Sequence, residues 1–174
     1  MAVRGERFKM PDGSVYVVRQ PAAESGGDVV EMEFVLPSGC VPPPPHVHRS
    51  QVEDYEVLEG SFEVVIDGRW RTLSAGDCAS VPVGALHTFR NRSGDVVRVR
   101  NRHRPAMRFE QFIERICEVL RAADVRRKRD PRVFLYLSMV MLDFEDTLIA
   151  TRWRDRVPMH ALAWLARRMP SPAT

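Results

Sequence analysis

Three histidines and one glutamate have the residue types and the spacing of a metal site. His46 and His48 are separated by one residue, Glu53 follows shortly after them, and His87 lies farther along the chain. Side chains alternate along a strand with period two, so the imidazoles of His46 and His48 would point the same way. Imidazoles together with a carboxylate suit a first-row transition metal and leave positions open for water or substrate. The sequence therefore predicts a metal site made by these four residues.

Turn residues surround the four candidate ligands at spacings that resemble the two motifs of the cupin superfamily. The first motif is matched by His46, His48, Glu53 and Gly60, and the second by Gly76, Pro82, Gly84, His87 and Asn91. Gly39 departs from the first motif because it lies one residue too far from His46, and prolines 42–45 fill the gap. The resemblance covers about residues 10–102 and leaves the last part of the chain unexplained.

The resemblance implies a jelly-roll β-barrel that holds one divalent transition metal per chain (Fe, Mn, Ni, Cu or Zn). With a redox-active ion, it implies a dioxygenase that acts on a small aromatic or enolisable, oxygen-rich substrate, in which Glu53 is both ligand and catalytic base. With zinc, it implies a non-redox isomerase or cyclase of secondary metabolism. A non-catalytic small-molecule binding or sensing protein is the third hypothesis. We favour the dioxygenase.

The first hundred residues consist of short β-rich segments separated by turns, which is typical of a sandwich or barrel. Glu59-Gly60 and Asp67-Gly68 both have the composition of a hairpin turn. The expected strands are 14–19, 29–36, 54–58, 61–66, 69–73, 77–81, 86–91 and 96–101.

Beyond Arg104-Pro105 the spacing of apolar residues becomes helical. Apolar residues three and four positions apart predict a helix over 107–123. Asp130-Pro131 has the form of a helix start, for a helix over about 131–151, and Pro158 opens a third helix that ends near 169. We therefore expect a mainly β chain with two parts: a cupin β-barrel domain over 1–104 and a helical extension of about three helices over 105–174.

The helix predicted over 131–151 is apolar on most faces and must be covered. A lid over the barrel or a homodimer interface is the favoured arrangement, and peripheral contact with a membrane surface is less favoured. Asp143, Glu145 and Asp146 interrupt the helix too centrally for a segment that spans a membrane.

Composition and charge set outer limits on the function. The 174 residues are 44% hydrophobic and 28% charged, which is typical of a globular protein. No signal-peptide pattern is present, and Cys40, Cys78 and Cys117 have no disulfide or CxxC spacing, so a cytoplasmic protein is expected. Residues 1–97 carry 9 basic and 14 acidic side chains (−5), and residues 98–174 carry 17 and 9 (+8). No motif supports nucleic-acid binding, so the expected partner is a small-molecule substrate.

Several other residues allow an expectation about their position. His103 stands among arginines and is expected at the surface, whereas His160 is expected to pack within the last helix. Gln51 could approach the metal, but a solvent-facing loop position is favoured. Tyr55 has the same parity as Glu53 and is expected inside the barrel. The candidates for an apolar pocket wall are Met32, Phe34, Phe62, Val64, Trp70 and Phe89.

Overall fold

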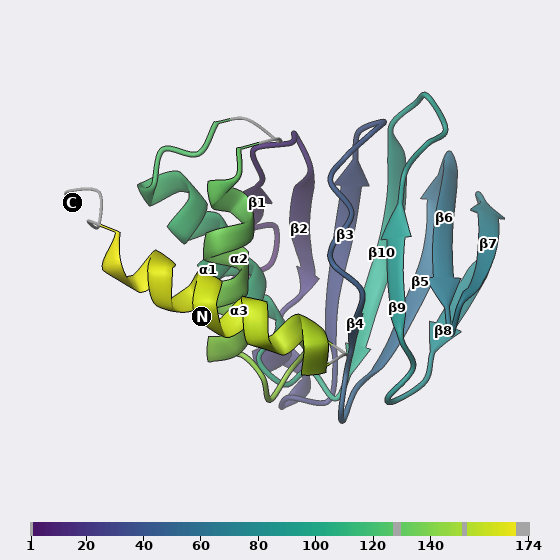
Figure 1. Ribbon diagram of the computed structural model, residues 1–174. Helices are drawn as coiled ribbons and strands as arrows, with labels where there is room; N and C mark the ends of the chain where they lie inside the picture. Colours follow the sequence, from purple (N-terminus) through teal and green to yellow (C-terminus); the bar gives the residue numbers. More distant parts are fainter. Residues whose placement is uncertain (1, 127–129, 151–152, 170–174) are drawn as a thin grey trace.

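The computed structural model describes residues 2–126, 130–150 and 153–169, and its strands form two antiparallel sheets with the helices gathered at one side (Figure 1). The six-stranded sheet contains, in spatial order, β1 (Arg7–Lys9), β2 (Val15–Gln20), β3 (Val30–Leu36), β10 (Val97–Arg104), β5 (Val52–Glu59) and β8 (Cys78–Val81). The five-stranded sheet contains β11 (Ile149–Ala150), β4 (His46–Val47), β9 (His87–Arg90), β6 (Ser61–Ile66) and β7 (Arg69–Ser74).

The chain moves between the two sheets as it proceeds, which is the topology expected of a double-sheet jelly roll. Among the described residues, hydrogen bonds do not join the sheets into a closed barrel. The predicted fold class is confirmed: a mainly β, cupin-like fold is followed by three helices, α1 (Phe109–Ala122), α2 (Arg132–Asp143) and α3 (Trp153–Arg168). A short 3₁₀ helix, η1 (Ala22–Ser25), precedes β3.

Period-two alternation places one side of each long strand in the core. On β10, for example, Val97 and Val99 are buried, and the arginines between them lie on the outer face. Five of the six predicted pocket-wall residues are buried: Met32, Phe34, Phe62, Val64 and Phe89. The prediction for Trp70 is wrong. It lies on the edge strand β7, is 47% exposed, and packs under the guanidinium of Arg90.

The two predicted hairpin turns have different outcomes. Asp67-Gly68 is confirmed, because Ile66 and Arg69 are register partners and both turn residues have positive φ angles, as a type I′ turn requires. Glu59-Gly60 is not a hairpin, because β5 and β6 belong to different sheets. Gly60, with a φ of 82°, instead lies at the point where the chain crosses from one sheet to the other.

The helices begin and end at different residues from those predicted. The amphipathic face of α1 is buried as expected, and the Asp130 carboxylate accepts a hydrogen bond from the Arg132 N–H at 2.9 Å at the start of α2. However, α2 ends at Asp143, and the predicted helical residues Ile149 and Ala150 form β11 beside β4. The last helix begins at Trp153, so Pro158 lies inside it.

The helices share one hydrophobic core with the strands, since buried residues of α1 and α2 belong to the same cluster as those of both sheets. The predicted boundary between 1–104 and 105–174 remains a prediction. Across the described residues, no helix combines the length and the apolar character needed to span a membrane.

Candidate metal centre

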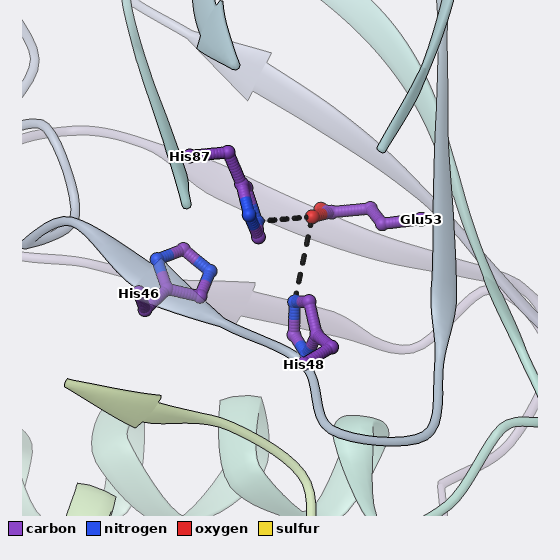
Figure 2. A group of neighbouring side chains, drawn as sticks. All are labelled: His46, His48, Glu53 and His87. Atoms are coloured by element: carbon purple, nitrogen blue, oxygen red, sulfur yellow. Dashed lines mark ion pairs between the residues drawn. The ribbon is translucent and has the colours of Figure 1, made fainter. Parts of the chain in front are cut away.

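His46, His48, Glu53 and His87 meet between the two sheets (Figure 2). His46 on β4 and His87 on β9 are direct register partners, and His48 lies just beyond the end of β4. Glu53 comes from β5 in the opposite sheet. One candidate ligand atom from each residue lies within 4.8 Å of the others, and all four residues are buried. The sequence-predicted residues are therefore brought together as one cluster.

Backbone carbonyls fix the same tautomer in all three imidazoles. The Nδ1 atoms of His46 and His87 lie 2.9 and 3.0 Å from the carbonyl oxygens of Pro44 and Ala85. The Nδ1 of His48 lies 2.8 Å from the Thr147 carbonyl oxygen. A carbonyl only accepts, so each Nδ1 must carry the proton and donate it. Each Nε2 is then left with a lone pair, which is the form that binds a metal.

The Glu53 carboxylate is held by one oxygen and presents the other to the imidazoles. The Asn101 side-chain amide donates a hydrogen bond to Oε1 at 2.7 Å, and the Nε2 of His103 lies 3.3 Å from the same oxygen. Glu53 Oε2 lies 2.7 Å from His87 Nε2 and 3.4 Å from His48 Nε2. These three facing atoms have no hydrogen-bond partner of their own among the described residues.

Electrostatics favour the neutral form of His46 and the ionised form of Glu53, whereas they favour the protonated form of His87. Burial, together with the nearby imidazoles of His87 and His48, holds the pKa of His46 well below its usual value. Burial alone would raise the pKa of Glu53, but the surrounding imidazoles, first that of His103, hold it well below the usual range. Burial alone would lower the pKa of His87, but its hydrogen bond to Glu53 and that carboxylate's charge raise it.

The donor set fits a single metal ion. With its proton on Nδ1, His87 presents a lone pair to Glu53 Oε2 at 2.7 Å, and two acceptors at that distance repel each other unless a proton or a cation lies between them. One ion held by the three imidazoles and the carboxylate would give a partner to His48 Nε2, His87 Nε2 and Glu53 Oε2, which have none among the described residues. Such a set suits first-row transition metals.

The expected positions of three other residues were wrong. His103 is fully buried, because the arginines of β10 occupy the outer parity of the strand and His103 the inner one. Gln51 is also buried, and its amide donates to the carbonyl oxygens of Pro105 and Ala106 at 2.9 Å, where the chain leaves the sheet and has no ladder partner. His160 is exposed on α3.

The sequence reasoning missed Asn101 and Thr147, and the inward orientation predicted for Tyr55 is confirmed. Asn101 shares the inward parity of Val97 and Val99, a signal that was available in the sequence. Tyr55 is buried, as expected. Its burial and the charge of Glu53 raise the pKa of Tyr55 well above the usual value. Glu56 points away from the cluster and pairs with Arg100 on the outer face.

A cavity of about 110 Å³ adjoins the cluster and includes His46 and Glu53 in its wall. Most of the remaining wall is apolar and comes from both parts of the chain. β-strand and loop residues in it include Tyr16, Phe34, Val41 and Phe89, and helical residues include Phe109, Phe112, Ile113, Ile116, Val133, Leu137 and Met141. The helices therefore close one side of the cavity.

Comparison with known proteins identifies the β part of the chain. Residues 32–100 match the family model of the cupin domain. The chain is 35% identical over 89 residues to the quercetin 2,3-dioxygenase of Bacillus subtilis (strain 168), across 51% of this chain and 26% of that protein. It is also 39% identical over 49 residues to an uncharacterized protein of Aquifex aeolicus (strain VF5), across 28% of this chain and 40% of that protein. The chain thus spans less than half the length of either relative.

Solved structures of low sequence identity share the fold. A predicted oxalate decarboxylase from Thermotoga maritima superposes with a TM-score of 0.53 at 19% identity, over 60% of this chain and 99% of that chain. An RmlC-like cupin from Shewanella frigidimarina gives a TM-score of 0.51 at 22% identity, over 59% of this chain and 85% of that chain. Residues 32–100 of this chain therefore match the cupin domain, and the strand topology and the cluster of three histidines and a glutamate agree with that match.

Proposed function

We propose that the chain is a metal-dependent dioxygenase that acts on a small aromatic or enolisable, oxygen-rich substrate. His46, His48, Glu53 and His87 would hold one divalent ion. The observation that carries the proposal is that two members of this cluster, His46 and Glu53, lie in the wall of a mostly apolar cavity. The 35% identity to a quercetin 2,3-dioxygenase supports the choice of reaction, over the part of that protein that matches.

The volume of the cavity limits the substrate. A cavity of about 110 Å³ is smaller than the apolar cavity of roughly 150 Å³ that accommodates benzene. A one-ring substrate with adjacent oxygen atoms would already require some movement of the cavity wall, and a three-ring flavonol would require a much larger movement of α1 and α2. The one-ring substrate is therefore the better match. The aromatic side chains Phe34, Phe89 and Phe109 would cover the faces of such a ring.

The chain's own residues would bind the substrate, exclude water and move one proton. A redox-active ion such as Fe²⁺, Mn²⁺, Ni²⁺ or Cu²⁺ would supply coordination sites for a chelating substrate and for dioxygen. Glu53 lines the cavity, and its lowered pKa keeps it ionised near neutral pH, so it can accept the proton of an enol or phenol hydroxyl. Asn101 would hold the other oxygen of that carboxylate in place.

Metal analysis and oxygen uptake test the proposal. Untagged protein is expected to contain about one redox-active ion per chain and to consume oxygen with a catechol-type substrate faster than with quercetin. Glu53→Gln should lower the rate by a factor of about 10² or more, because the base is lost. Glu56→Gln, on the same strand but facing outward against Arg100, is the matched control and should keep the wild-type rate.

Other outcomes would favour the two alternatives. Stoichiometric zinc without oxygen uptake would contradict the dioxygenase and favour a non-redox isomerase or cyclase. Stoichiometric metal with no turnover of any screened substrate would favour a binding or sensing protein. Absence of metal from reconstituted protein would contradict both metal-dependent enzymes.

We also propose that the chain forms a homodimer through its helices. Phe134 on α2 and Trp164 and Leu165 on α3 are 59%, 54% and 47% exposed in the single chain, although all three are large and apolar. Light scattering after size-exclusion chromatography should give the mass of a dimer, and Phe134→Glu should give a monomer. Val96→Glu, at an exposed position away from the helices, is the control and should remain dimeric.

A further inference from the structure

The segment that joins α2 to α3 returns to the metal centre. Thr147 is buried, and its carbonyl oxygen accepts the Nδ1–H of His48 at 2.8 Å, across 99 residues of sequence. The next residues form β11, which pairs with β4 so that Ile149 is opposite Val47 and Ala150 is opposite His46. Residues 147–150 of the helical extension therefore contact the strand segment that carries two of the four candidate ligands.

His48 differs from the other two imidazoles in the source of its support. His46 and His87 each donate to the carbonyl two residues earlier, so their tautomers are fixed by the backbone just before their own strands. The Nδ1 of His48 instead depends on Thr147, which is distant in sequence. If the extension moved away, the buried Nδ1–H would lose its acceptor and the ring would lose both its fixed tautomer and its orientation. Partners of this kind affect metal affinity by about 10- to 100-fold.

The same extension also closes the cavity. Leu148, next to Thr147, lines the cavity together with Leu137 and Met141 of α2. A displacement of α2 and β11 would open the cavity and release His48 in one movement. The helical extension thus both supports the His48 ring and closes the cavity.

We propose that residues 147–150 are a positioning element of the metal centre, and that docking of the helical extension and metal binding strengthen each other. The inference rests on metal binding by the four residues of the proposed function, but not on which reaction follows. Coupling between two sites is reciprocal, so a bound ion must stabilise the docked extension by the same factor by which the docked extension raises metal affinity.

A proline at position 148 tests the coupling at one residue. Leu148→Pro removes the hydrogen bond from the Leu148 N–H to the Phe144 carbonyl and disfavours the turn conformation of Thr147, so it displaces the Thr147 carbonyl. Leu148→Ala is the comparison variant, because it removes the packing of the same buried side chain but keeps the N–H that holds this turn. We expect Leu148→Pro to weaken Co²⁺ affinity, measured by chelator competition, by about 10- to 100-fold and to change the Co²⁺ absorption spectrum. Leu148→Ala should weaken Co²⁺ affinity less than Leu148→Pro does, because the Thr147 carbonyl keeps its place.

A double-mutant cycle separates positioning of His48 from general destabilisation. In a His48→Ala background the proline should have a much smaller effect on Co²⁺ affinity, because the ring that Thr147 supports is absent. The same loss in both backgrounds, or no loss in Leu148→Pro, would overturn the inference and leave the proposed metal site standing. No Co²⁺ binding by the full chain would overturn both.

Hydrogen exchange on the unaltered chain gives an answer even if Leu148→Pro does not fold. Added Co²⁺ should slow amide exchange in α2 and in residues 147–150. The expected factor is about the one by which the docked extension raises Co²⁺ affinity. The β6–β7 hairpin, which carries no ligand, is the internal reference. Equal protection of both regions, or protection of the ligand strands alone, would contradict the coupling.

Discussion

At the scale of single residues, the least expected group of the centre is His103. It is fully buried, its ring stacks on Phe109 with centroids 3.5 Å apart, and its Nε2 lies 3.3 Å from Glu53 Oε1. Burial lowers the pKa of His103 to about 4, so the ring stays neutral at neutral pH even beside a carboxylate. A neutral ring here adds no positive charge that would compete with a bound cation.

This buried imidazole makes the metal-free protein sensitive to acid. Between pH 6.5 and about 4 the unfolded chain binds a proton at His103 that the folded chain does not, so the free energy of unfolding falls as the pH falls through this window. The pKa difference corresponds to a loss of up to about 3 kcal/mol. His46, whose pKa is also lowered, adds a loss of the same sign.

Urea unfolding of metal-free protein at pH 7, 5.5 and 4.5 measures this effect. His103→Leu should reduce the loss of stability between pH 7 and 4.5 without abolishing it, because His46 still contributes. If the pH profile of His103→Leu is the same as that of the unaltered chain, His103 is not the source.

At the scale of elements, Gly60 marks the crossing between the two sheets. Its φ of 82° is costly for any residue with a Cβ, and a Cβ there would lie 3.0 Å from the Val96 carbonyl oxygen and 3.3 Å from Val97 Cα. Gly68 in the β6–β7 turn has nearly the same φ, 79°, but a Cβ at that position would have no described atom beyond its chain neighbours within 4 Å. The two glycines share the backbone requirement and differ in the space around them.

Alanine substitutions at these two glycines therefore separate the cost of a positive φ angle from the cost of a steric clash between the new Cβ and neighbouring backbone. Gly68→Ala should cost about 1 kcal/mol of unfolding free energy, from the positive φ alone. Gly60→Ala should cost more, about 2–4 kcal/mol, because the backbone of Val96 and Val97 must also shift. Chemical unfolding of both variants measures the difference. Equal losses would mean that the crossing has room for a methyl group.

Sequence reasoning brought together the four candidate ligands and located most strands, because each had a strong local signal. The candidate ligands stand among turn residues at set spacings, and β6, for example, was predicted with its observed bounds. β11 could not be predicted, because a strand of two residues has no periodicity and Ile149-Ala150 continues an apolar helical pattern. The surface position predicted for His103 was an avoidable error, because the alternation of arginines along β10 already assigned it to the inner face.

At the scale of the whole molecule, ion pairs partly balance the uneven distribution of charge between the two halves of the sequence. β10 lies between β3 and β5, so its arginines meet acidic residues from the first half of the chain on the outer face. Arg98 pairs with Glu33, Arg100 with Glu56 and Arg102 with Glu31, each at 2.7 Å. These pairs join segments distant in sequence, so part of the charge difference between the two halves is balanced within the fold.

A bound ion would join the two sheets in the same way, but from the inside. His46 and His87 come from the five-stranded sheet and Glu53 from the six-stranded one, and the unfolded chain cannot keep them together. A ligand that binds only the folded state stabilises it by about 2.7 kcal/mol at a hundredfold excess over Kd. For a chain of this size the melting temperature should then rise by roughly 5–10 °C.

Calorimetry with and without Co²⁺ measures that rise, and its dependence on the free metal concentration identifies its origin. A specific site predicts a shift that grows with the logarithm of the concentration once the site is filled, since mass action governs it. The His46→Ala/His48→Ala double variant keeps Glu53 and His87 but loses half of the donor set, and it should lose most of the shift. A shift of the same size in the double variant would mean that the metal binds elsewhere on the surface and that the buried cluster does not hold the sheets together.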